Sequence, residues 1–379
     1  GYTAALEAAR LGLHTAVVER REVGGTCLNR GCIPTKTLLH ASQVYRDAVD
    51  GSPAGVHAGD ITFNLGEMFA YKRAVSEKLR GGIHALLKGA KVDLLEGTAR
   101  IDAPGRVTVA GPEGDTVYTA DRILAATGSV PVRPPIPGLD LPGVMTSDEL
   151  LEGSDSLYES LVIMGGGVIG VEFATFYANL GCRVTLIEGM DRLLPTMDRE
   201  LGQNLGQILK KQGVEVLTSA MVRRVEQTPE GLTVHVDQKG REKAVSGEKV
   251  LCAIGRRPCW DGLFAPELVP ETRGRSLLVD EDFRTSIPGV YAIGDVSAVI
   301  QLAHVAAAQG IACVNRMCGR QSATDLNVVP SCIYSSPEIA VVGLTEAEAK
   351  EAGIPVKVGK HVMFDNCLLY TSPSPRDTR

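Results

Sequence analysis

The N-terminal residues change from a helical to an extended apolar pattern. Apolar and small residues recur at helical spacing from Gly1 to Leu11 and stop at Gly12, and a β-branched run then ends in Glu19. A helix, a short turn and a strand ending in an acid form the second half of a dinucleotide-binding βαβ unit. Because no strand precedes Gly1, we expect an N-terminal truncation that removes the first strand and first glycines of this unit.

A second unit of this kind is complete. The pattern predicts a buried strand over residues 160–164, a G-x-G-x-x-G turn from Gly165 to Gly170, a helix over 171–180 and a strand over 183–188. The same glycine spacing occurs in ordinary turns, but its place between a strand and a helix favours a nucleotide site. Two units predict two dinucleotide cofactors.

Glu188, at the end of that last strand, bears on which dinucleotide is bound. It follows Gly165 by about the interval, roughly 20 residues, at which a carboxylate meets the ribose 2′-hydroxyl. The same carboxylate would repel a 2′-phosphate. The sequence therefore favours NAD over NADP.

Composition shifts indicate where the chain divides. Residues 129–138 are rich in proline, which suits a connection and marks the approach to a domain boundary. From Val329 the pattern is strand-rich again, whereas residues 367–379 carry Ser-Pro repeats without periodicity, and we predict a non-native tail there. The predicted α/β domains are 1–150 and 151–270 around the two nucleotide units, 271–328 as a return to the first, and 329–366 as a truncated α+β domain.

Composition and charge exclude several classes of partner and site. A net charge of −6 without a basic cluster argues against nucleic acid, and no apolar run is long enough to cross a bilayer. The first residues lack the features of a signal peptide, so we predict a cytoplasmic protein. Nine cysteines without a C-x-x-C pair support neither a secreted disulfide framework nor a zinc site, and we predict no metal.

Residues 24–36 carry the most specific chemical pattern. On a regular helix, at about 100° per residue, Cys27 and Cys32 would point about 140° apart and would not bridge easily. Gly31 and Pro34 indicate a distorted helix start instead. There the positive end of the helix would lower a thiol pKa and favour the reactive thiolate.

An arbitrary C-x₄-C is more often a pair of buried thiols than a redox centre. Around Cys27 and Cys32 the glycine-rich lead and the following Lys36 favour the redox interpretation. Cys313 and Cys318 have the same spacing in a predicted helix, without that lead or a lysine, and we interpret them as structural.

Residues 24–36 resemble the redox-active disulfide of the pyridine nucleotide-disulfide oxidoreductases, and Cys-Leu-Asn-x-Gly-Cys-Ile-Pro-x-Lys looks most like the dihydrolipoyl dehydrogenases. The resemblance implies an FAD domain, an NAD domain and a dimerisation domain. It implies that Cys27 exchanges with the substrate disulfide, that Cys32 faces the flavin, and that Lys36 lies beside the isoalloxazine as a stabilising cation.

The same resemblance implies the reaction and its partners. Protein-bound dihydrolipoamide would be oxidised to lipoamide, with electrons passing through the disulfide and FAD to NAD⁺. The partner would be the lipoyl domain of a 2-oxoacid dehydrogenase or glycine cleavage complex, and the full-length parent would be a homodimer. A mercuric reductase-like or other oxidoreductase of the family, or an inactive NAD-binding fragment, is the alternative.

Resemblance also assigns the binding residues. For FAD they are Gly1, Glu19, Arg20, Gly25, Thr26, Cys27, Lys36, Gly97, Ala99, Thr127, Gly128, Ser129, Asp295, Leu302, Ala303 and His304. For NAD they are Gly165, Gly166, Gly167, Val168, Ile169, Gly170, Glu172, Glu188, Val222 and Gly255. Residues 251–258 resemble the strand and turn beside NAD. The alternatives are a solvated helix acid for Glu172 and a helix cap for Asp295.

One family feature is absent from the sequence. The family's base is a histidine near the C-terminus that a nearby glutamate orients across the dimer, but His361 is the only late histidine and no glutamate follows it. We interpret His361 as a strand residue. The expectation is therefore an active parent enzyme, truncated at both ends here into a chain that is itself inactive.

Overall fold

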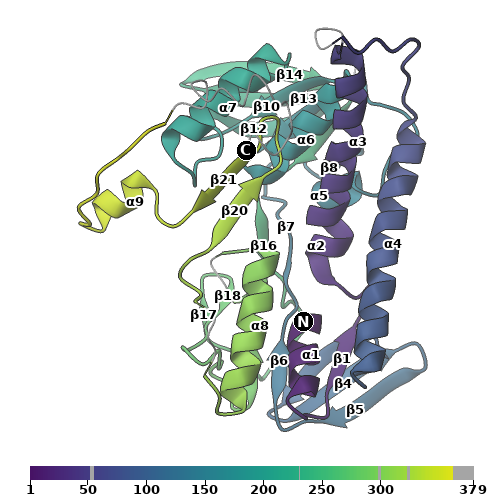
Figure 1. Cartoon of the computed structure of the whole chain (residues 1–379), viewed down its shortest axis with the longest axis vertical. Coiled ribbons are helices and arrows are strands. Elements are labelled where there is room, and N and C mark those ends of the chain that lie inside the picture. The colour runs from purple at the N-terminus through teal and green to yellow at the C-terminus, as the bar shows by residue number, and fades with distance from the viewer. Residues whose placement is uncertain (52–54, 230, 298–299, 322–324, 362–379) are drawn as a thin grey trace. The chain divides into compact units, whose positions relative to one another are not determined.

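The computed structural model describes residues 1–51, 55–229, 231–297, 300–321 and 325–361 (Figure 1). The chain forms two compact units, described separately below. Unit 1 contains residues 1–34, 70–131 and 256–326, and unit 2 contains 35–69, 132–255 and 327–379. The change of unit after Pro131 falls inside the proline-rich segment, which was interpreted from the sequence as the approach to a domain boundary. The domain limits at 150 and 270 remain predictions.

A parallel sheet organises unit 2. In the part of this unit that the structure describes, the sheet has five strands in the order β11-β10-β9-β15-β8. Their bounds are Glu215–Leu217, Arg183–Ile187, Ser160–Met164, Lys249–Cys252 and Val144–Thr146. The predicted strands over 160–164 and 183–188 are confirmed as β9 and β10.

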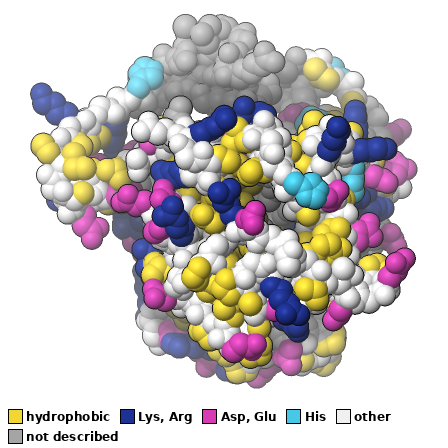
Figure 2. All heavy atoms as spheres, turned by 90° about the horizontal axis from the view of Figure 1, so that it is seen from below, with side chains coloured by type: hydrophobic (Ala, Val, Ile, Leu, Met, Phe, Trp, Pro, Cys, Tyr) yellow, Lys and Arg dark blue, Asp and Glu magenta, His cyan; other side chains and the backbone are white. Residues whose placement is uncertain are grey.

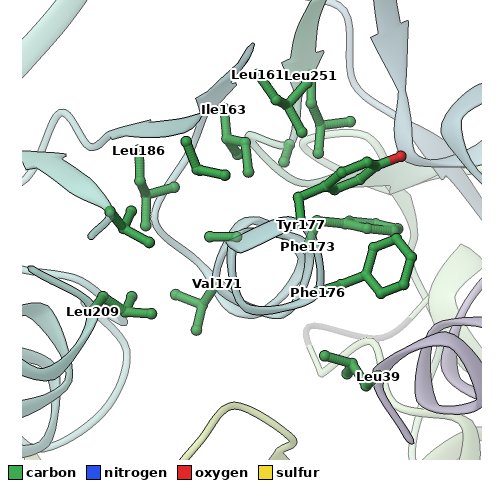
Figure 3. Close-up of a cluster of buried hydrophobic side chains, with 14 of the residues drawn as sticks. Leu39, Leu161, Ile163, Val171, Phe173, Phe176, Tyr177, Leu186, Leu209 and Leu251 are labelled. Carbon is green, nitrogen blue, oxygen red and sulfur yellow. The ribbon is translucent and has the colours of Figure 1, made fainter. Parts of the chain in front are cut away.

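Alternate residues of β9 enter two different cores. Leu161 and Ile163 pack in the cluster around helix α6 (Val168–Asn179), which Figure 3 shows. Val162 and Met164 pack in a second cluster, with residues of an antiparallel sheet. Successive side chains of a strand point to opposite faces, so an apolar run is needed where both faces are covered.

Further elements complete unit 2. The antiparallel sheet joins β12 (Ala220–Thr228), β13 (Gly231–Gln238) and β14 (Arg241–Gly247). Helices α5 and α7 span Ser147–Leu150 and Arg199–Lys211. The C-terminal part contains β20, β21 and α9, with bounds Pro330–Ile333, Ile339–Val342 and Glu346–Glu351. The predicted strand-rich region is thus confirmed over its described part, but His361 lies exposed outside any strand, so its interpretation as a strand residue was wrong.

Unit 1 begins with the predicted helix and strand, α1 (Tyr2–Arg10) and β1 (Ala16–Glu19). Strand β1 pairs in parallel with β2, and β6 pairs in parallel with β19. The bounds of the other strands are Asp93–Glu96 (β2), Thr98–Ala103 (β3), Arg106–Gly111 (β4), Gly114–Thr119 (β5), Ile123–Ala125 (β6), Ser129–Pro131 (β7), Arg256–Pro258 (β16), Thr272–Arg273 (β17), Ser276–Leu277 (β18) and Val290–Ala292 (β19).

Helices pack with these strands and with each other around small hydrophobic cores. Helix α8 (Ala303–Met317) packs against α1, where Gly310 allows a close approach to Ala4. Helix α2 covers Gly25–Arg30 and a 3₁₀ turn, η2, covers Gly294–Val296. Helices α3 (Cys32–Asp50) and α4 (Leu65–Gly89) each begin in one unit and end in the other.

Charges of both signs lie side by side on the face drawn in Figure 2, where basic and acidic side chains are interspersed. The acidic excess of the sequence is thus not gathered into one field on that face. Across the described ranges, no helix combines the length and apolar character needed to cross a membrane.

Candidate functional site

Cys27 and Cys32 form a disulfide where two helices meet. Helix α2 ends at Arg30, Gly31 leaves helical geometry at φ −152° and ψ −113°, and Cys32 begins α3. This break brings the two Cα atoms to 4.6 Å, within the range that a disulfide spans. The predicted distortion is therefore confirmed, and the alternative of two unlinked buried thiols is wrong.

The junction between the helices needs a residue without a side chain at Gly31, and the N-terminus of α3 places positive electrostatic potential at Cys32. A Cβ on Gly31 would lie 3.1 Å from the carbonyl oxygen of Thr26 and 3.3 Å from the Cα of Cys27, so larger side chains would crowd the bridge. The sulfur of Cys32 sits at the positive end of a helix of 19 residues. A helix N-terminus stabilises negative charge, which suits a sulfur that must leave as a thiolate.

The second C-x₄-C pair serves as an internal control. Cys313 lies buried inside α8, Cys318 follows its last residue, and both thiols are free. Burial raises the pKa of the Cys313 thiol to about 12, which keeps it protonated and unreactive. This pair therefore differs from Cys27 and Cys32 in forming no disulfide, and its structural interpretation stays a prediction.

Asp295 belongs to a hydrogen-bonded chain inside unit 1. Its Oδ2 accepts from the hydroxyl of Ser129 at 2.6 Å. The Ser129 hydroxyl oxygen in turn accepts from Nε of Arg256 at 3.0 Å, and the Ser129 carbonyl accepts from Nη2 of the same guanidinium at 2.9 Å. Ile293, not Asp295, holds the cap position of η2, so the interpretation of Asp295 as a helix cap was wrong.

Arg256 joins this hydrogen-bonded chain in unit 1, and it was not among the site residues predicted from the sequence. Residues 251–258 were expected beside NAD as one segment, but the structure divides them after Gly255. Arg256–Pro258 form β16, which pairs with β7 in unit 1. The signal in the sequence was Gly255, whose φ of +124° allows the turn between the units.

The other predicted FAD residues also lie in unit 1, except Lys36. Glu19 ends β1, and its Oε1 accepts from the amide of Arg21 at 3.0 Å. Gly97, with φ +153°, approaches Ala110 so closely that a Cβ would overlap its carbonyl oxygen. The rest occupy the start of α1, the position after β1, the start of α2, strand β3, the segment before β7 and the start of α8; they are Gly1, Arg20, Gly25, Thr26, Ala99, Thr127, Gly128, Leu302, Ala303 and His304.

Every predicted NAD residue lies in unit 2, where three glycines shape a tight turn before α6. A Cβ on Gly165, at φ +110°, would overlap the carbonyl oxygen of Ala253, and a Cβ on Gly170 would overlap that of Gly165. The space around Gly167, at the N-cap of α6, is open. These are the three roles of a dinucleotide fingerprint: tight turn, close helix packing and approach of the pyrophosphate. The residues therefore fit a dinucleotide.

Glu188 follows β10 and is bound to the same turn. Its two carboxylate oxygens accept from the amides of Gly166 and Met190, each at 2.7 Å. A carboxylate has lone pairs left after two such bonds, so a ribose hydroxyl can still donate to it. Val222 lies on β12, where the pairing with β13 shifts register.

Glu172 is buried and paired. Only 4% of it is exposed, and its carboxylate accepts from Nζ of Lys36 at 2.7 and 3.0 Å. The amide of Tyr334 donates to the same carboxylate at 3.1 Å. The alternative of a solvated helix acid was therefore wrong. Tyr334 was not predicted from the sequence, because it lies 162 residues from Glu172 and no local pattern connects the two.

No group of three or more His, Cys, Asp and Glu side chains suited to a metal ion occurs among the residues with a described position.

The sequence of the chain also matches a known protein family and several named relatives. Residues 1–310 match the family described as pyridine nucleotide-disulphide oxidoreductase, and residues 329–371 match its dimerisation domain. A dihydrolipoyl dehydrogenase of Bacillus subtilis is 40% identical over 375 residues, covering 95% of this chain and 78% of the relative. One from Geobacillus stearothermophilus is 36% identical, covering 95% and 76%.

Solved structures agree in fold. LpdA from Mycobacterium tuberculosis superposes with a TM-score of 0.88 at 28% identity, covering 98% of this chain and 82% of that one. The Cu(II) complex of the HOCl-induced flavoprotein disulfide reductase RclA from Escherichia coli gives 0.80 at 31% identity, covering 93% and 77%. These likenesses extend over both units.

Proposed function

Because the chain belongs to the pyridine nucleotide-disulphide oxidoreductase family, whose members bind FAD and NAD(P), we propose that it is a dihydrolipoyl dehydrogenase linked to NAD. The proposed reaction converts dihydrolipoamide and NAD⁺ into lipoamide, NADH and a proton. The observation that carries the proposal is the disulfide of Cys27 and Cys32 at the α2–α3 break. The relatives from Bacillus subtilis and Geobacillus stearothermophilus, which the chain matches over 78% and 76% of their length, are dihydrolipoyl dehydrogenases.

The cysteines exchange electrons with the substrate in two steps. A thiolate of dihydrolipoamide attacks Cys27, and the bond to Cys32 breaks with its electron pair on the Cys32 sulfur. The second substrate thiolate then attacks the mixed disulfide, which releases lipoamide and the Cys27 thiolate. The substrate loses two protons and two electrons, and the protein disulfide gains the two electrons.

Two sets of residues would hold the cofactors. Asp295, fixed by Ser129, would accept from an FAD hydroxyl, and Glu188 would accept from the adenosine ribose of NAD. Lys36 and Glu172 would present a paired cation and anion to the redox groups. Bound FAD would supply the two-electron chemistry that connects the protein dithiol with NAD⁺.

The test is a set of matched assays on the purified full-length parent protein supplied with FAD. We expect a yellow protein that reduces NAD⁺ with dihydrolipoamide, at least about tenfold faster than NADP⁺ because Glu188 repels the 2′-phosphate. Faster NADPH-dependent reduction of Hg²⁺ or glutathione disulfide would replace this proposal with another member of the family. A colourless protein that still binds NADH would support the NAD-binding fragment.

Replacing Ser129 with alanine should weaken FAD binding by about tenfold, because the Asp295 carboxylate and the Arg256 guanidinium both lose a partner. Quenching of flavin fluorescence during titration of the apoprotein measures this affinity. Ser76→Ala is the matched control: Ser76 is equally buried in unit 1, but its hydroxyl donates to the Leu28 carbonyl. Equal FAD affinities for the two variants would contradict the role of Ser129.

A further inference from the structure

Tyr334 touches both members of the ion pair between Lys36 and Glu172. Its backbone amide donates to Oε1 of Glu172 at 3.1 Å. Its ring faces the ammonium group of Lys36, with 4.6 Å between Nζ and the ring centroid. Three segments far apart in sequence, α3, α6 and the end of β20, therefore meet at one pair of charges within unit 2.

Strand β20 fixes where the amide of Tyr334 points. Ile333, the last residue of β20, is fully buried and pairs with Ile339 of β21, and both side chains belong to the core around α6. Anchoring residue 333 in that core leaves little freedom for the next peptide group. The amide can therefore replace water as a donor to Glu172, which is only 4% exposed.

The ring of Tyr334 is not explained by packing alone. The residue is 39% exposed, so it belongs to the surface rather than to the core. The ring instead covers part of the Lys36 side chain, which remains 30% exposed. A cation over an aromatic face is stabilised by the ring quadrupole, and more so where water is partly excluded.

We propose that Tyr334 is a positioning residue that holds Lys36 and Glu172 in register for electron transfer to or from the nicotinamide cofactor. The inference rests on the proposed function, which places this pair at the redox groups. It adds that the segment matching the dimerisation domain contributes to the redox site of its own chain. Removing the ring should release the ammonium group while leaving the amide contact with Glu172.

The first test needs no bound cofactor. Lys36 is acylated with a limiting amine reagent, and the rate is followed by peptide mass spectrometry. Tyr334→Leu should raise the rate about threefold, in line with the loss of one cation–π contact, whereas Tyr334→Phe should match the unchanged chain. Tyr118→Leu is the control, because Tyr118 is 38% exposed on β5 in unit 1.

Each result of the acylation experiment either supports or overturns the inference. A raised rate only in Tyr334→Leu supports the inference, whereas an unchanged rate, or an equal rise in Tyr118→Leu, overturns it. If Tyr334→Leu unfolds, as far-ultraviolet circular dichroism would show, Tyr334→Met takes its place with the same expectation.

A second readout uses the FAD-loaded protein. Tyr334→Leu should slow the bleaching of the flavin by NADH about threefold without changing the affinity for ADP-ribose, which lacks the nicotinamide. Equal losses in bleaching and in ADP-ribose affinity would indicate a merely structural residue and overturn the inference. Failure of the proposed function is distinguishable, because it would remove dihydrolipoamide oxidation but not the response of NADH bleaching to this substitution.

Discussion

Cys32→Ser should lower dihydrolipoamide-dependent NAD⁺ reduction by about a thousandfold or more. The substitution removes the disulfide with Cys27, so the protein can no longer accept two electrons from a dithiol. Loss of a residue that forms the reacting bond commonly costs this much or more. The rate of NADH formation, followed at saturating substrate, measures the effect.

A second activity tests whether the loss in Cys32→Ser comes from the missing disulfide alone. Transfer from NADH to an artificial acceptor needs the bound flavin but not the disulfide, so we expect Cys32→Ser to retain most of it. The matched control is Cys318→Ser, which removes one member of the unlinked pair in the same C-x₄-C spacing. If Cys318→Ser lost as much dithiol oxidation as Cys32→Ser, or if Cys32→Ser retained it, the disulfide could not be the route of the electrons.

Sequence reasoning succeeded where the chemistry is local. The glycines at 165, 167 and 170 act within one turn, and the junction at Gly31 is decided by its immediate neighbours. In both cases the side chains that must fit are only a few residues away. Local pattern therefore predicted the distorted helix junction and the glycine turn before α6, whereas the pairing of Cys27 with Cys32 came from the family resemblance.

Prediction from the sequence failed for residues whose hydrogen-bond partner is distant in sequence. Arg256 donates to Ser129 across 127 positions, and Tyr334 donates to Glu172 across 162. No periodicity encodes such a pairing. The alternatives of a cap for Asp295 and a solvated face for Glu172 were wrong for the same reason, since each treated the residue only within its own element.

The division of the chain between the two units was missed for the same reason: it depends on contacts between segments distant in sequence. The predicted domains follow the order of the sequence, whereas the compact units exchange segments at 34, 69, 131, 255 and 326. Helices α3 and α4 cross from one unit to the other without any break in their pattern. The crossing after Pro131 carried a local signal in its run of prolines, and the crossing after residue 255 carried one in Gly255.

Lys36→Met should destabilise the protein by about 2–3 kcal/mol, somewhat less than the roughly 3–5 kcal/mol for breaking a fully buried ion pair, because Lys36 is 30% exposed. The variant leaves the Glu172 carboxylate in a site where only 4% of the residue is exposed, without the cation that balanced it. Denaturant unfolding, followed by a probe for unit 2, measures the change. Lys243→Met provides the control: Lys243 and Glu215 are also 2.7 Å apart but are 40% and 50% exposed, so a cost below about 1 kcal/mol is expected.

The double variant Lys36→Met, Glu172→Leu separates two explanations of that cost. If the cost comes from an uncompensated buried charge, removing the charge should restore most of the stability, because apolar pairs often replace buried ion pairs without loss. If it comes from lost packing, the double variant should be no more stable than Lys36→Met. Restored stability together with slow flavin reduction by NADH would show that the pair is dispensable for folding. Its presence would then be explained by the charge it supplies to the redox reaction.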